Sequence, residues 1–145
     1  MNLVIKRFDA LTTPELYAIL AARVAVFVVE QQCPYPETDG KDFAAYHLFY
    51  EENGAILAYL RILDAPEGTR RVHIGRVLTT RRGCGFGKAL MLEALTVART
   101  RMRADSVYLE AQSYARGFYE ALEFTQISDE FLEDGIPHIG MELTL

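Results

Sequence analysis

Three glycines at alternate positions, Gly83, Gly85 and Gly87, place the strictest limit on how this chain folds. They lie between an apolar run typical of a strand, Val72–Leu78, and an apolar pattern at helical spacing over Gly87–Met102. Glycine lacks a Cβ, so the backbone there can approach a ligand closely and adopt positive φ. The N-terminus of the following helix attracts anions. The arrangement predicts a phosphate-binding loop, and an ordinary tight turn is the alternative.

The loop matches neither of two common phosphate-binding motifs. A P-loop needs glycine where this chain has Arg82, and serine or threonine where it has Ala89. A dinucleotide motif needs a further glycine three residues after an alternate pair, and none is present. The pattern Arg82-x-x-Gly85-x-Gly87 does fit, and it resembles the pyrophosphate loop of the GNAT superfamily of N-acetyltransferases. That resemblance assigns seven residues to cofactor binding: Arg82, Gly83, Cys84, Gly85, Phe86, Gly87 and Lys88.

Size and patterning predict a single domain over residues 1–145. Half of the residues are hydrophobic, and the chain shows no linker, repeat or low-complexity tract. Alternating strand and helix patterns predict a mixed α/β fold, in which helices pack on a sheet. The expected elements are strand Val4–Phe8, a helix beginning near Thr12, strands Tyr46–Glu51, Ala55–Leu63 and Val72–Leu78, helix Gly87–Met102, strand Ser106–Ala111, helix Ala115–Leu122, and strands Ile127–Phe131 and Pro137–Leu143.

Charge and cysteine content narrow the function classes. The net charge of −5 argues against general nucleic-acid binding, and no apolar run is long enough for a membrane span. Cys33 and Cys84 lack disulfide or metal-ligand spacing, and no signal peptide is recognisable, so we expect free thiols, no metal site and a cytoplasmic protein. Nine basic residues and one acid lie between Arg70 and Arg103. This basic region either holds an anionic cofactor or is a solvated face.

A second segment, Phe118–Phe124, strengthens the resemblance to GNAT proteins. It is similar to their F-Y-x-x-x-G-F motif, in which the tyrosine lies near the coenzyme sulfur. The resemblance implies that Tyr119 is the general acid, and a packed aromatic ring is the alternative. The chain has Glu123 where the family usually has glycine. If the backbone needs positive φ there, glutamate costs about 1 kcal/mol; otherwise the turn has another form.

Longer stretches resemble the ElaA-like group of GNAT proteins. They are Arg23–Gln31, Cys33-Pro34-Tyr35, Glu37, Asp39-Gly40, Asp42, Ala111-Gln112 and Glu133–His138, and together they span most of the chain. The resemblance implies the GNAT acyl-CoA N-acyltransferase fold, with a mostly antiparallel sheet flanked by helices. It also implies acetyl-CoA as the donor and an amine of a small molecule or peptide as the acceptor.

The same resemblance assigns roles along the cofactor site. The pantetheine arm is expected to pair with the backbone near Val77, Leu78 and Thr79, and Gln112 is assigned to the cofactor site as well. A backbone N–H of Val77 or Leu78 would stabilise the oxyanion. Cys84 within the glycine loop would face the phosphates, so a structural role is favoured over a nucleophilic one.

The general base is less defined by the sequence. Arg23 and Glu30 are seven residues apart, so they share a face if the helix continues, and they suggest a polar substrate pocket with Glu30 as the base. A plain salt bridge at the helix end is the alternative. His73, on the strand expected to face the thioester, is a candidate for substrate binding. His73, His47 and His138 are also candidates for the base, and a packed or solvated side chain is the alternative for each of them. The acids Glu30, Glu37, Asp39 and Asp42 either receive a cationic amine or form a solvated loop.

Two other function classes remain open at this point. The same fold can bind acyl-CoA as a non-catalytic sensor, or it can transfer other acyl groups. Tyr119 favours an enzyme, because a simple binding module has little use for a proton donor. The sequence leaves open whether the protein is a monomer or a homodimer.

Overall fold

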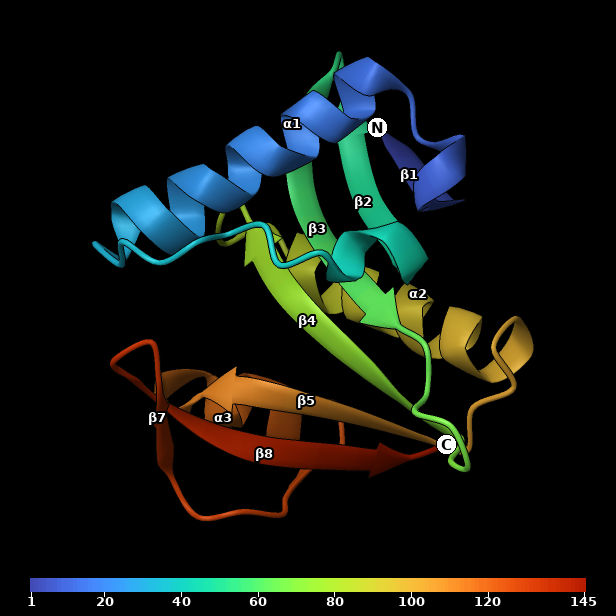
Figure 1. The fold of residues 1–145 in the computed structure, drawn as a ribbon, viewed down its shortest axis with the longest axis vertical. Helices are drawn as coiled ribbons and strands as arrows, with labels where there is room; N and C mark the ends of the chain where they lie inside the picture. Colours follow the sequence, from blue (N-terminus) through green and yellow to red (C-terminus); the bar gives the residue numbers. More distant parts are fainter.

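An eight-stranded mixed sheet forms the centre of the molecule (Figure 1). The computed structural model describes all residues, 1–145. Seven strands follow the order β1-β2-β3-β4-β5-β8-β6, with β7 also paired to β8. All pairs are antiparallel except β4 with β5. The strands are β1 Asn2–Arg7, β2 Tyr46–Glu52, β3 Ala55–Leu63, β4 Arg71–Thr79, β5 Ser106–Gln112, β6 Thr125–Gln126, β7 Phe131–Glu133 and β8 Ile136–Thr144.

Helices cover both faces of this sheet. They are α1 Thr13–Arg23, continued by a π-helix over Val24–Glu30, then α2 Phe86–Thr100 and α3 Arg116–Glu120, with short 3₁₀ turns at Phe8–Ala10, Lys41–Ala44 and Ser113–Ala115. The larger core lies beneath α2 and α3 and contains Leu90, Met91 and Ala94 of α2. The smaller core lies beneath α1, where Ile19 is fully buried against Tyr59 and neighbouring side chains. The predicted mixed α/β fold is confirmed.

Local sequence signals explain how several elements begin and end. The N-terminus of α1 carries a capping box, because Thr12 accepts a hydrogen bond from the Glu15 amide and the Glu15 carboxylate accepts one from the Thr12 amide. The turns at Asn53-Gly54 and Asp134-Gly135 have positive φ at both residues, as type I′ hairpin turns require. The Glu123 backbone adopts φ of 74°, so glutamate does occupy a left-handed position at the end of α3.

One expected strand, Ile127–Phe131, is wrong as a continuous element. The structure has the short strands β6 and β7 on either side of residues 127–130 instead. The Ser128 hydroxyl accepts a 2.8 Å hydrogen bond from the Gly140 amide of β8. This side chain therefore replaces a backbone partner in the ladder, as serine commonly does at turns.

Strand β4 departs from its parallel neighbour along its length, and this divergence creates the site. Pairing with β5 covers only Arg71–His73, after which the two strands separate (Figure 1). On the other side, Arg61 of β3 pairs with Gly75 and Tyr59 pairs with Leu78, so β4 has one extra residue between them. This is a β-bulge, and Arg76 within it has φ of 54°. Beyond the bulge, β4 is therefore paired with β3 alone.

Candidate active site

A cavity of about 930 Å³ lies between the diverging strands β4 and β5. One wall is formed by β4, the π-helix and the loop over residues 33–41. The other wall is formed by β5, α3 and the hairpin of β7 and β8. Eight residues predicted from the sequence as site residues line it: Glu30, His73, Val77, Leu78, Thr79, Arg82, Gln112 and Tyr119. The topology therefore brings together residues separated by up to ninety positions.

The glycine loop lies at one end of this cavity and leads into α2. Gly83 and Gly85 have φ of 75° and 77°, a region in which side chains other than glycine are strained. Gly85 is the N-cap of α2, so the unpaired N–H groups of the first helical turn face the loop. At Gly87 the limit is space, because an added Cβ would lie 3.3 Å from the Thr79 side chain. The free backbone N–H groups and the positive end of the α2 dipole thus match an anion-binding site, beside the positive charges of Arg82 and Lys88.

Arg82 connects the glycine loop to the end of the π-helix. Its guanidinium forms an ion pair with the Glu30 carboxylate, and both side chains are largely exposed. The sequence pattern instead suggested that Glu30 shares a polar pocket with Arg23. That pairing is wrong, because the chain changes from α- to π-helix at Val24 and the slower winding turns Glu30 away from Arg23.

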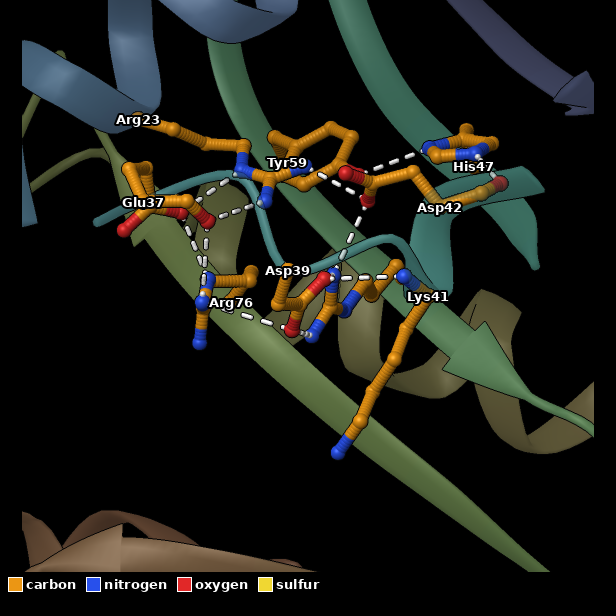
Figure 2. A network of polar contacts seen from close by, with 9 residues as sticks. Arg23, Glu37, Asp39, Lys41, Asp42, His47, Tyr59 and Arg76 are labelled. Atoms are coloured by element: carbon orange, nitrogen blue, oxygen red, sulfur yellow. Dashed lines mark hydrogen bonds and ion pairs between the residues drawn. The ribbon is translucent and has the colours of Figure 1, made fainter. Parts of the chain in front are cut away.

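Arg23 is fully buried and belongs to a network of ion pairs (Figure 2). It donates to the Glu37 carboxylate at 2.8 Å and to the Asp42 carboxylate at 2.7 Å. Arg61 donates to Asp42 at 2.9 Å. Arg23 is absent from the cavity lining. The structure thus places this predicted substrate-binding residue behind the cavity wall.

The acidic loop is not a free cation-binding surface. Glu37 is bound by Arg23 and Arg76, and Asp39 by Arg61 at 2.5 Å. Burial of Asp39 raises its pKa, but hydrogen bonds from Arg61 and Lys41 outweigh this and hold the pKa well below its usual range. In Figure 2 the Lys41 side chain extends away from these pairs, and it lines the cavity. All four predicted acids therefore pair with an arginine: Glu30 with Arg82, and the other three within this network.

Tyr119 projects from α3 into the wall of the cavity. It is 8% exposed, and its ring packs edge-on against Phe118 and Phe124 at centroid distances of 5.0 and 6.0 Å. Burial, with a smaller effect of Tyr114, raises the pKa of its hydroxyl. The hydroxyl therefore stays protonated at neutral pH, as a proton donor must.

Glu110 is a cavity residue that the sequence reasoning missed. It lies on β5 between Leu109 and Ala111, which are buried in the larger core, and it faces the opposite side. Burial, followed by the neighbouring Glu133 carboxylate, raises the pKa of Glu110. Neither carboxylate forms an ion pair with a lysine or arginine, and the ion-pair partner of Glu133 is His138, at 3.6 Å. The alternation of Tyr108, Glu110 and Gln112 against apolar neighbours was the signal that could have identified it.

His73 lies on the β4 side of the cavity. Its ring packs edge-on against Tyr108 at 5.1 Å. Burial, reinforced by the positive charges of Lys41, Arg61 and Arg71, lowers the pKa of His73 to about 4. The imidazole is therefore neutral at neutral pH. It can hydrogen-bond to a substrate but carries no positive charge to repel a cationic one.

The two cysteines are free thiols, as predicted. Cys84 is exposed, its sulfur lies 3.7 Å from the Arg82 carbonyl, and it does not line the cavity. Cys33 contacts the Asp134 carbonyl at 3.4 Å, linking the loop to the β7–β8 hairpin. The chain has no group of three or more histidine, cysteine and acidic side chains arranged to hold a metal ion. None of its helices has the length and apolar character of a membrane span.

Comparisons with known proteins agree with this architecture. The family model for an acetyltransferase (GNAT) domain matches residues 18–145. The UPF0039 protein of Schizosaccharomyces pombe is 41% identical over 100% of this chain and 98% of its own. The Escherichia coli protein ElaA is 40% identical over 90% of this chain and 88% of its own.

Solved structures give the same result. An acyl-CoA N-acyltransferase from Pseudomonas aeruginosa superposes with a TM-score of 0.91 at 42% identity, covering 98% of this chain and 99% of that one. The crystal structure of E. coli ElaA also gives 0.91, at 36% identity, covering 97% of each chain. Fold, cavity and sequence similarity together lead to one assignment: this chain belongs to the GNAT acetyltransferase family, within its ElaA-like group.

Proposed function

We propose that this protein transfers an acetyl group from acetyl-CoA to a primary amine of a small molecule or peptide. The observation that carries the proposal is the divergence of β4 from β5 directly beside the glycine loop. The opening gives a long, narrow ligand access to a strand edge, and the loop offers its phosphates a helix N-terminus. The thioester supplies an activated acyl group, so positioning and proton transfer are the tasks left to the protein.

The residues of the glycine loop and of β4 have the chemistry and the positions that binding of coenzyme A requires. The positive φ of Gly85 lets the backbone turn into α2, so that the first amides of the helix can face a pyrophosphate. Arg82 and Lys88 supply positive charge at the same end. Val77 and Leu78 follow the bulge of β4 and line the cavity, where a backbone N–H would polarise the thioester carbonyl.

Two cavity residues would move the protons of the reaction. The Tyr119 hydroxyl would donate its proton to the departing thiolate, since its raised pKa keeps it protonated. The Glu110 carboxylate, supported by Glu133, would attract the ammonium of the acceptor and take up its proton. We place the general base at Glu110 instead of Glu30, because the Glu30 carboxylate is bound to Arg82 at the glycine loop. Glu30 would then orient Arg82 toward the phosphates.

Calorimetric titration with acetyl-CoA, together with thiol release against a panel of amines and peptides, tests the proposal. We expect binding, and release of the free thiol with at least one acceptor. Gly85→Val is expected to weaken binding at least tenfold, because valine is strained at φ of 77° in the loop. Gly68→Val, at a remote turn with φ of 82°, is the matched control and should bind normally. Binding without release for any acceptor would contradict the enzyme and favour a sensor.

Replacing Tyr119 with phenylalanine tests the proposed acid. We expect kcat to fall about 100-fold, because the thiolate then leaves without a proton donor, while acetyl-CoA affinity stays within twofold. Steady-state kinetics and calorimetry measure the two quantities. Tyr17→Phe, on the exposed face of α1, is the matched control. An unchanged kcat in the Tyr119 variant would overturn the acid role and leave a packing role for the ring.

A further inference from the structure

The bulge in β4 is held by a side-chain contact from a different part of the chain. Arg76, at the bulge, has a left-handed backbone, which a residue with a Cβ adopts only when its surroundings impose it. Its Nε donates to the Glu37 carboxylate at 2.5 Å, and its Nη2 donates to the Glu37 carbonyl at 3.1 Å. Figure 2 shows Glu37 directly above Arg76, with Asp39 on the other side of the guanidinium.

Glu37 is itself fixed from behind. The buried Arg23 donates to its carboxylate at 2.8 Å and to its carbonyl at 3.2 Å. The Glu37 side chain is only 9% exposed, whereas that of Arg76 is 28% exposed. Glu37 thus links the buried Arg23 of α1 to the partly exposed Arg76 of β4. Charge-assisted bonds of this kind are stronger than neutral ones.

The bulge determines which way the following backbone faces. Before it, Ile74 packs in the larger core beneath α2. After it, Leu78 packs in the smaller core beneath α1, although both positions are even-numbered and would otherwise share a face. Val77 lies between them and contacts the larger core. The orientation of the Val77 and Leu78 amides therefore depends on the conformation at Arg76.

We propose that Glu37 is a positioning residue for acyl transfer: through Arg76 it holds the β4 bulge in the conformation that presents a backbone amide, of Val77 or Leu78, to the thioester. This inference rests on the function proposed above. The same residue also anchors the loop over residues 33–41, which together with β4 forms one wall of the cavity. Glu37 thereby fixes this loop and β4 relative to one another.

The first test measures the backbone without using activity. In the ¹⁵N–¹H spectrum of the free protein, Glu37→Gln should shift the Val77 and Leu78 amide signals clearly. Glu15→Gln, which alters a carboxylate paired with Lys6 outside this network, is the matched control and should leave them nearly unchanged. Arg76→Lys is a second variant, at a partly exposed position. It keeps the positive charge but loses the two hydrogen bonds of the guanidinium to Glu37, so it should give amide shifts similar to those of Glu37→Gln. Equal shifts in the Glu15 variant, or none in the Glu37 variant, would overturn the inference.

The second test separates chemistry from binding. Glu37→Gln should lower kcat at least tenfold and leave the acetyl-CoA dissociation constant within twofold, whereas Glu15→Gln should keep kcat within twofold. The double variant Glu37→Gln/Arg76→Lys should be no slower than the slower single variant, because the two residues act as one unit. Additive losses would contradict the inference. Absence of thiol release in the unmodified protein would instead refute the proposed function, while the amide shifts would still report on the positioning.

Discussion

Replacing Asp42 with asparagine is expected to lower the free energy of unfolding by about 3 kcal/mol, the largest stability effect we expect from one isosteric substitution. The Asp42 carboxylate accepts from two buried arginines, Arg23 and Arg61, at 2.7 and 2.9 Å. Burial alone would raise the pKa of Asp42, but these arginines outweigh it and lower the pKa. Asparagine keeps the shape and removes the charge, so two buried guanidinium groups lose a shared counterion.

Urea denaturation followed by circular dichroism measures this loss. Glu15→Gln is the matched control, because Glu15 also contacts a cation, Lys6 at 3.0 Å, but lies near the surface. We expect the control to lose less than about 1 kcal/mol. A loss of this small size in the Asp42 variant would mean that the two arginines find other partners or water. An unchanged m-value in both variants would show that the unfolded states are comparable.

Replacing Glu110 with glutamine should lower kcat/KM by about 100-fold or more, the largest effect on activity that we expect. Glutamine fills the same space on β5 but accepts no proton from the acceptor ammonium. The folded domain should keep its acetyl-CoA affinity, because Glu110 lies on the β5 wall of the cavity, where we place the acceptor. Glu67→Gln, at an exposed turn outside the cavity, is the matched control and should match the unmodified protein.

The raised pKa of Glu110 determines how the rate should change with pH. Burial and the Glu133 carboxylate raise the pKa of Glu110, so its proton-accepting form is lost at a higher pH than for an exposed glutamate. The rate should therefore fall as the pH drops through this raised pKa, and Glu133→Gln should move the fall to lower pH by removing the negative neighbour. The Glu110 variant should lack this acidic limb. A limb that persists unchanged in Glu110→Gln would assign it to another group.

Much of the fold could be predicted from sequence patterns that involve only residues close together in the chain. The capping box at Thr12 and Glu15 and the hairpin at Asn53-Gly54 each depend on contacts within four residues, and the structure shows both. Alternating and helical spacing likewise predicted β3 and α2 to within two residues at either end. The glycine loop belongs to this class too, because its character depends on the φ that three glycines allow.

Other parts of the site depend on which distant segments meet. The sequence placed Arg23 with Glu30 on one helical face, yet the π-helix separates them and the guanidinium binds Glu37 and Asp42. Whether a carboxylate is a free base or a neutralised partner depends on the arginine beside it, and no spacing along the chain shows that. Glu110 was overlooked for the same reason, since its importance arises from the cavity and from Glu133 on another strand.

The sequence by itself determined the helix caps, the turns and the glycine loop, because short-range sterics and hydrogen bonding set these features. Tertiary structure alone decided the β4 bulge, the partners of the buried arginines and the carboxylates that remain unpaired in the cavity. These features arise when segments more than ten residues apart compete for the same charged groups in a space that excludes water. Burial makes each such pairing strong, and only the folded chain determines which residues are buried together.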